Sequence, residues 1–106
     1  DGNGSLPDFD ENGKMIGLSV AGFDTVGREF ADLVESEKLD IPTALAPITC
    51  NPARMLGLDG SKGHLGCGHD ADILVLDDAL APETVIARGK VAMIGKERLL
   101  RGTFER

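Results

Sequence analysis

The chain has 106 residues, of which 42% are hydrophobic and 27% charged, and its formal net charge at pH 7 is −7. This composition is typical of a globular protein of one domain at most, and it excludes a disordered chain. The acidic balance argues against a nucleic-acid-binding surface, which needs clustered Lys and Arg. The apolar runs fall well short of the roughly 20 residues that a membrane-spanning helix needs.

Cysteine content and the start of the chain indicate the compartment. Cys50 and Cys67 are the only cysteines, too few for the disulfide framework of a small secreted domain. The first residues lack the basic and apolar regions of a signal peptide, so we expect a cytoplasmic protein. Because the chain begins at Asp1 among turn-forming residues and contains neither Trp nor Tyr, we also expect it to be a piece of a larger protein.

The first twenty residues combine turn chemistry with one short strand. Residues 1–13 are rich in Gly, Asp, Asn and Pro and predict a loop. Asn12-Gly13 favours a two-residue type I′ hairpin turn, and the alternation from Ile16 to Val20 predicts a strand. Residues 8–13 also match the first half of a calcium-binding loop. The twelfth position of that loop requires a bidentate carboxylate and is Ser19 here, so we interpret the segment as a turn.

Two helices are predicted next. From Asp24 onward, apolar residues recur at steps of three and four, which predicts a helix capped by Asp24 or Thr25 and ending near Ser36. Pro42 suits the first turn of a second helix. Pro47 cannot donate the hydrogen bond that would continue this helix, so we expect a kink or an end there.

A third, short helix is predicted around residue 53. Asn51 is the expected cap and Pro52 the expected first residue. Gly57 is the expected stop. Met55 and Leu56 are the side chains that we expect this helix to bury.

The remainder reads as a connector followed by strands. Residues 57–71 contain a glycine at every third position from Gly57 to Gly66, which indicates a flexible connector. Ile73–Leu76 is a continuous apolar run, typical of a strand covered on both faces. The last expected elements are a hairpin of residues 85–87 and 91–94 around Arg88-Gly89-Lys90, and an edge strand at Leu99-Leu100.

One group of side chains in the connector could suggest a metal. His64, Cys67 and His69 are close in sequence, but their spacing matches no standard zinc pattern and no fourth ligand is evident. We therefore favour a structural or solvent-exposed role for them. Cys50, without a His partner nearby, is interpreted as a small buried hydrophobic residue.

Two motifs carry a family resemblance. Thr49-x-Asn51-Pro52-Ala53 and Gly68-x-Asp70-Ala71-Asp72, in this order and spacing, resemble the C-terminal end of the amidohydrolase superfamily. The start, Asp1-Gly2-Asn3-Gly4-Ser5-x-Pro7, and the end, Gly102-Thr103-Phe104-Glu105, are similar to the isoaspartyl (β-aspartyl) dipeptidases within it. Cys67 departs from the pattern, since the family often has Pro there.

This resemblance implies a fold and a division of the chain. Amidohydrolases combine a catalytic (β/α)8 TIM barrel with a small β-sandwich. Residues 1–58 would be the end of the barrel domain, with its last loop and helices, and residues 59–106 would be the C-terminal antiparallel strands of the sandwich. The chain would thus be an α/β fragment of an amidohydrolase, and α+β when taken alone.

The resemblance also implies a reaction and its residues. Asp1 would be both a metal ligand and the catalytic base, and Ser5 would hydrogen-bond the substrate's free α-carboxylate. The cofactors would be two divalent metal ions, and Zn(II) is the metal that we expect. Their other ligands would lie outside this chain, so the 106 residues alone would be inactive. The implied partners are an isoaspartyl dipeptide, the N-terminal part of the same protein and further copies of it.

Two alternatives remain open at this point. One is another amidohydrolase, such as a cyclic-amide hydrolase, because the superfamily motifs do not specify a substrate. The other is a non-catalytic module whose strands after residue 72 pair with another chain, since exposed strand edges invite such pairing.

Overall fold

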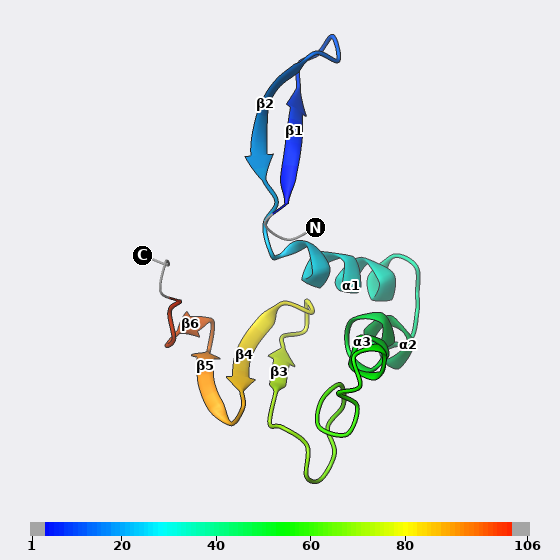
Figure 1. Ribbon diagram of the computed structural model, residues 1–106, viewed down its shortest axis with the longest axis vertical. Helices are drawn as coiled ribbons and strands as arrows, with labels where there is room; N and C mark the ends of the chain where they lie inside the picture. Colours follow the sequence, from blue (N-terminus) through cyan, green and yellow to red (C-terminus); the bar gives the residue numbers. More distant parts are fainter. Residues whose placement is uncertain (1–3, 103–106) are drawn as a thin grey trace.

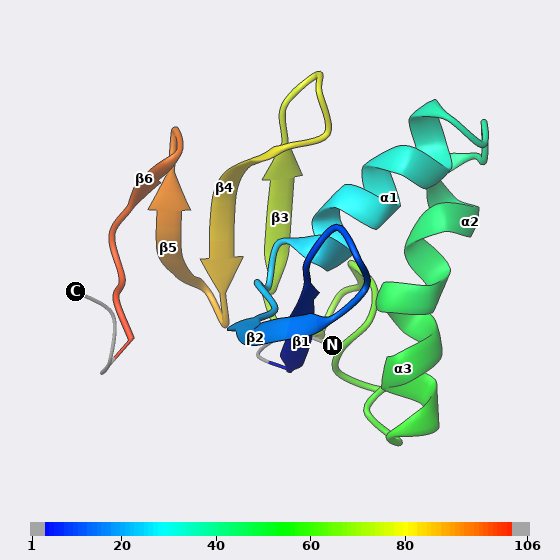
Figure 2. The same ribbon diagram turned by 90° about the horizontal axis from the view of Figure 1, so that it is seen from above.

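The computed structural model describes residues 4–102. It contains a projecting hairpin, a group of short helices and a four-stranded sheet, and the helices lie on the β3 side of that sheet (Figures 1 and 2). This arrangement confirms the α+β class. In chain order the elements are β1 (Ser5–Phe9), β2 (Met15–Val20), α1 (Thr25–Glu35), α2 (Ile41–Leu45), the 3-10 helix η1 (Ala46–Ile48), α3 (Cys50–Met55), β3 (Ile73–Leu76), β4 (Pro82–Ala87), β5 (Lys90–Ile94) and β6 (Glu97–Arg98).

The hairpin corrects two expectations. Residues 5–9 were expected to be a loop, but they form β1, which pairs antiparallel with β2 in the register Ser5 to Val20. The turn has three residues and is not type I′, because among its residues only Gly13 has a positive φ, of 79°. The Asp10 carboxylate accepts the backbone N–H groups of Asn12 and Lys14, each at 2.9 Å. Asp10, one of the acidic residues that match a calcium loop, thus closes a hairpin turn. This agrees with the interpretation of the segment as a turn.

The helix α1 begins and ends where the pattern predicts. Asp24 is its N-cap residue, although the carboxylate makes no capping hydrogen bond. That carboxylate instead lies 3.0 Å from the Arg28 guanidinium, one helical turn further on. Phe30 is the buried residue of α1, so the helix is held by packing of this one face.

The helix α2 is short because two residues define its ends. At its start the Asp40 carboxylate accepts the Thr43 hydroxyl at 2.7 Å and the Thr43 N–H at 3.1 Å. These bonds, the hydroxyl bond first, hold the pKa of Asp40 below its usual value. Pro42 lies in the first turn. The helix ends at Leu45 and continues as η1, which contains Pro47, as the missing N–H of this proline predicts.

The helix α3 differs from expectation at its start and in its burial. It begins at Cys50, so Asn51 lies inside the helix and does not cap it. Met55 and Leu56 are 87% and 72% exposed, because nothing else in residues 4–102 covers them. The buried residue of α3 is Ala53, over which the backbone of Gly63 packs: a Cβ at Gly63 would lie 2.6 Å from that of Ala53.

The sheet has the antiparallel order β3-β4-β5-β6. Its β4–β5 turn contains Arg88 and Gly89 at φ of 48° and 78°, the left-handed pair that a two-residue hairpin needs. A second such turn at Gly95 and Lys96 places the last strand at Glu97–Arg98, two residues earlier than expected. Leu74 and Val75 of β3 are about half exposed in this chain, so the described residues do not cover both faces of that strand.

The connector has no helix or strand, but charged groups attach it to the sheet. The Lys62 ammonium lies 2.9 Å from the Asp70 carboxylate and 2.6 Å from that of Asp72. Asp72 also accepts the N–H of Arg88 at 2.7 Å, and the N–H of Gly89 donates to the carbonyl of Ala71 at 3.0 Å. The connector is therefore bonded to the β4–β5 turn and is not a free tether.

A second charged group closes the loop between β3 and β4. The Asp77 carboxylate accepts the N–H groups of Ala79 and Ala81, at 3.0 and 2.9 Å. It also lies 2.7 Å from the ammonium of Lys96. One side chain thus connects the β3–β4 loop to the β5–β6 turn.

We expect the stability of the sheet to be constant around neutrality and to fall at both pH extremes. Bonds from Lys62 and Lys96 lower the pKa of Asp72 and Asp77, and the same contacts raise the pKa of the two lysines. The carboxylate contribution is complete above about pH 4, the ordinary carboxyl range, and is lost as the pH falls through the lowered pKa values. The lysine contribution is complete below about pH 10 and is lost as the pH rises through the raised ones.

The measurement is the thermal midpoint between pH 2 and pH 11 for the wild type and Asp77→Asn. The Asn variant should lose less stability in acid than the wild type. Asp78→Asn is the matched control, because Asp78 makes no hydrogen bond or ion pair with another described residue. An Asp77→Asn profile that overlays the wild type below pH 4 would contradict the assignment.

The helices of residues 4–102 are too short and too polar to cross a membrane.

Candidate functional site

Ser5 is the predicted site residue that the structure describes. It is the first residue of β1, opposite Val20 on β2. Just before it, the carbonyl of Gly4 accepts the N–H of Ala21 at 2.8 Å, which closes the base of the hairpin. Ser5 is exposed, and its hydroxyl makes no hydrogen bond with another described residue.

Asp1, the other predicted site residue, lies outside the described residues, together with Gly2 and Asn3. Most of the C-terminal motif, from Thr103 on, lies outside them as well. The roles of Asp1 as base and as metal ligand therefore remain predictions.

The described residues do not fit the metal centre that the family resemblance implies. Nowhere in residues 4–102 do three or more His, Cys, Asp or Glu side chains gather in a way that could hold an ion. His64 and His69 do lie together, with ring centroids 4.1 Å apart. The Nε2 of His69 lies 3.1 Å from the carbonyl of Asp59, so it must carry the proton and donate. That hydrogen bond ties the ring to the connector backbone.

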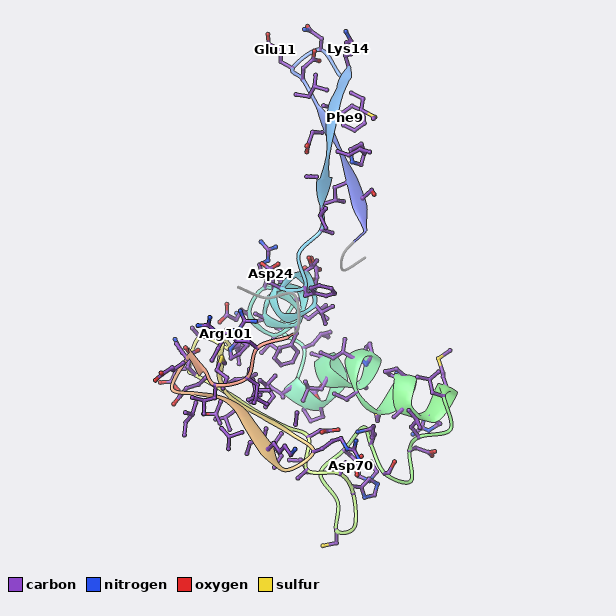
Figure 3. The ribbon with its side chains drawn as sticks, turned by 60° about the vertical axis from the view of Figure 1, so that its left-hand side comes forward. Phe9, Glu11, Lys14, Asp24, Asp70 and Arg101 are labelled. Carbon is purple, nitrogen blue, oxygen red and sulfur yellow. The ribbon has the colours of Figure 1, made fainter. Side chains whose placement is uncertain are left out.

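The charged cluster of the connector also has a structural role. Lys62 is paired with two carboxylates at once. Figure 3 shows Asp70 in the connector, at the end of the molecule opposite the hairpin tip. The cluster is thus remote from the hairpin, and nothing in its geometry brings it to Ser5.

A groove of about 780 Å³ lies between the helices α2 and α3, the connector and β3. Apolar side chains dominate its lining, with Lys62, Asp70 and Asp72 among the polar groups. Ser5 does not line it. The groove was not predicted from the sequence. The signal that could have indicated it is the apolar run of β3, whose side chains form part of its lining. Its apolar lining residues include Pro42, Leu45, Ile48, Pro52, Leu56, Leu58, Ile73, Leu74 and Leu76.

Among the residues that the structure describes, Ser5 is the one predicted site residue on the projecting hairpin. The connector residues His64, Cys67 and His69 lie in the other part of the molecule, and Cys67 is exposed. Cys50 is partly buried and bonds weakly to the carbonyl of Ala46, at 3.8 Å from Sγ to oxygen. The arrangement of the described residues can bind a polar group at Ser5, but it does not by itself assemble a catalytic centre.

Comparison with known proteins provides the context for this fragment. The family described as "Amidohydrolase family" matches residues 18–92. Mouse (Mus musculus) N-acetylglucosamine-6-phosphate deacetylase is 34% identical over 84 residues, which are 79% of this chain and 20% of that protein. Dihydroorotase of Pelotomaculum thermopropionicum is 36% identical over 92 residues, which are 83% of this chain and 20% of that protein.

A solved structure matches nearly all of the chain. The β-aspartyl dipeptidase of Fervidobacterium islandicum AW-1, in complex with a β-Asp-Leu dipeptide, superposes with a TM-score of 0.78 and 31% sequence identity. The match covers 97% of this chain and 26% of that one. This chain thus spans about a fifth to a quarter of the length of these relatives. By sequence and by fold, it belongs to the amidohydrolase family.

Proposed function

We propose that the chain is the C-terminal part of a metal-dependent isoaspartyl dipeptidase that hydrolyses β-aspartyl peptide bonds. The observation that carries the proposal is the extent of the likeness to the β-aspartyl dipeptidase. A match over 97% of the chain is too long to omit β1, whereas the family-wide match begins at residue 18, inside β2. The likeness to the dipeptidase therefore includes β1, which begins with Ser5.

The small core supports the view that these residues belong to a larger protein. Within residues 4–102 the buried hydrophobic residues are Ala21, Phe30, Ala44 and Ala53, three of which are alanines. Many large apolar side chains are exposed on the helices, on β3 and along the groove. Such extensive exposed apolar surface marks contact with further protein, which we propose is the rest of the barrel and the sandwich.

The proposed chemistry assigns one task to each of two residues. Hydrolysis of an isoaspartyl amide needs a base for the attacking water and a proton for the leaving nitrogen. The Asp1 carboxylate would accept the proton from water and pass it to that nitrogen. The Ser5 hydroxyl would donate a hydrogen bond to the free α-carboxylate of the isoaspartyl residue. The divalent ions of the family would supply Lewis acidity, and residues beyond the described range would have to hold them.

Other amidohydrolase activities are the second candidate, because the relatives named above include a deacetylase and a dihydroorotase. Substrate choice separates the candidates. We expect the full-length protein to hydrolyse a β-aspartyl dipeptide and not N-acetylglucosamine 6-phosphate or dihydroorotate. Turnover of either of the latter two in preference to the dipeptide would contradict the proposal.

Replacing Ser5 tests the residue assignment within this function. Ser5→Ala removes one hydrogen bond to a charged group, which contributes about 1.5–3 kcal/mol. The KM for a β-aspartyl dipeptide should therefore rise about 10- to 150-fold, with kcat nearly unchanged, because the carboxylate is held alike in ground and transition states. An analogue that lacks the α-carboxylate should be affected little.

Ser19→Ala is the matched control for this experiment. Ser19 lies on the same hairpin, but its hydroxyl already donates to the Asp8 carboxylate at 3.2 Å. Its loss should leave KM for both substrates near the wild-type value. If Ser5→Ala penalises both substrates equally, Ser5 has only a structural role in β1 and does not bind the α-carboxylate.

A further inference from the structure

The turn of the β1–β2 hairpin joins an asparagine directly to a glycine. The asparagines of the chain are Asn3, Asn12 and Asn51. Asn51 precedes Pro52, which has no N–H. Asn3, which also precedes a glycine, lies outside the described residues. Asn12 is therefore the described asparagine that is followed by a reactive backbone N–H, that of Gly13.

An Asn-Gly sequence can rearrange without an enzyme. The backbone nitrogen of Gly13 loses its proton and attacks the side-chain carbonyl carbon, Cγ, of Asn12. A new N–C bond forms, ammonia leaves, and the product is a five-membered cyclic imide. Glycine favours this step because it has no Cβ to hinder the approach. Water then opens the imide: attack at the backbone carbonyl of residue 12 gives an isoaspartyl bond, and attack at Cγ gives an ordinary aspartyl bond.

The hairpin tip is open to water. Asn12 and Gly13 are exposed, and a Cβ built at Gly13 would meet no atom of the described residues within 4 Å beyond its chain neighbours. Figure 1 shows the tip projecting away from the helices and the four-stranded sheet, and Figure 3 places Glu11 and Lys14 there. The tip residues, 10 to 14, contain no apolar side chain. Burial under further protein would cost the hydration of their charges, which favours a solvated tip in the complete protein.

The hydrogen bonds of the turn oppose the rearrangement. The N–H of Gly13, whose nitrogen must attack, donates to the carbonyl of Asp10 at 3.0 Å. The Asp10 carboxylate accepts the N–H groups of Asn12 and Lys14, so it holds the peptide groups on either side of the reacting one. The nitrogen can therefore attack only after the turn has opened.

We propose that Asn12 is a site of spontaneous isoaspartate formation and that the Asp10 carboxylate limits the rate by holding the turn closed. The conversion adds a negative charge beside Asp10 and Glu11. In the isoaspartyl product it also adds one methylene group to the backbone of the turn, which changes the spacing of the N–H groups that Asp10 accepts. The hairpin that begins with Ser5 should thus lose stability as the protein ages.

The test follows the full-length protein during incubation in mildly alkaline buffer, which favours loss of the Gly13 proton. Peptide mapping by mass spectrometry, with synthetic isoaspartyl and aspartyl peptides as standards, measures the conversion at each asparagine. We expect both products at Asn12 and neither at Asn51. The folded protein should convert about tenfold or more slowly than the same protein unfolded in guanidinium chloride, because hydrogen bonds of the turn must break first.

The variants Asp10→Ala and Glu11→Ala separate turn closure from charge. Each removes one carboxylate from the tip, but the Glu11 side chain makes no hydrogen bond or ion pair with another described residue. Asp10→Ala should raise the conversion rate about fivefold or more, since two hydrogen bonds are lost. Glu11→Ala should convert at nearly the wild-type rate.

Three outcomes would overturn the proposal: an unconverted Asn12 in the wild type, equal rates in the two variants, or equal rates in folded and unfolded wild type. The last comparison keeps the test valid if Asp10→Ala fails to fold. The measurement uses no substrate, so its outcome stands apart from that of the proposed function.

Discussion

Asp1→Asn in the full-length protein is expected to lower kcat for a β-aspartyl dipeptide by about two to four orders of magnitude, the usual cost of losing a general base. The amide keeps the size of the side chain and one oxygen, but it cannot accept a proton at neutral pH. The fold should be unaffected, since Asn has the same number of heavy atoms as Asp. The measurement is kcat and KM together with the thermal midpoint.

Asp8→Asn is the matched control for this loss. It makes the same substitution on β1, where the Asp8 carboxylate accepts the Ser19 hydroxyl, a role that an amide oxygen can fill. Activity should remain near that of the wild type. If Asp1→Asn instead keeps near-wild-type kcat, Asp1 is not the base and the proposed reaction needs another one.

Gly63→Ala is expected to produce a large loss of stability. Gly63 has a φ of +92°, and a Cβ there would lie 2.6 Å from the Cβ of Ala53 and 3.1 Å from the Cα of Cys50. The backbone conformation costs an alanine about 1–2 kcal/mol. Overpacking against α3 adds about 1–3 kcal/mol. The free energy of unfolding should fall by about 2–5 kcal/mol in total.

Gly60→Ala is the control, because nothing lies within 4 Å of a Cβ at that position and its φ is not in the left-handed region. It should leave stability unchanged or raise it by up to about 1 kcal/mol, since alanine restricts the unfolded chain. Urea unfolding followed by circular dichroism measures both variants. Equal stability of the two would mean that the connector can move away from α3 at no cost.

Local chemistry explains which parts of the fold could be predicted. Pro42 and Pro47 act through their own missing N–H and fixed φ, so the bounds of α2 followed from the sequence. Gly89, with its left-handed backbone, likewise marked the β4–β5 turn. These residues impose their conformation whatever surrounds them.

Burial and strand pairing could not be predicted in this way, because they depend on distant residues. The segment of β1 contains Pro7 and Asp8, which disfavour strands, and it becomes a strand through pairing with β2. Met55 and Leu56 occupy apolar positions of α3, yet the described chain provides nothing to cover them. The buried position, Ala53, is chosen by the close approach of Gly63, ten residues away.

The candidate site was predicted from motifs and not from physical chemistry. Asp1 and Ser5, beside glycines, read by themselves as a turn. Only the family resemblance gave them a role. The structure adds that Ser5 begins a strand and that its hydroxyl makes no hydrogen bond with the residues from 4 to 102. Within residues 4–102, no group of three or more His, Cys, Asp or Glu side chains completes a metal site.

The close approach of Gly63 to Ala53 makes the predicted boundary at residues 58 and 59 a poor exchange point for chimaeras between relatives. A crossover there would take Ala53 from one parent and Gly63 from the other, although the two are in van der Waals contact and leave no room for a larger side chain at either position. Asp72 and Arg88 would still come from the same parent, so the hydrogen bond between them and the sheet would be preserved. A chimaera that receives this sheet from another amidohydrolase should therefore receive α3 from the same parent. The crossover then lies before Thr49.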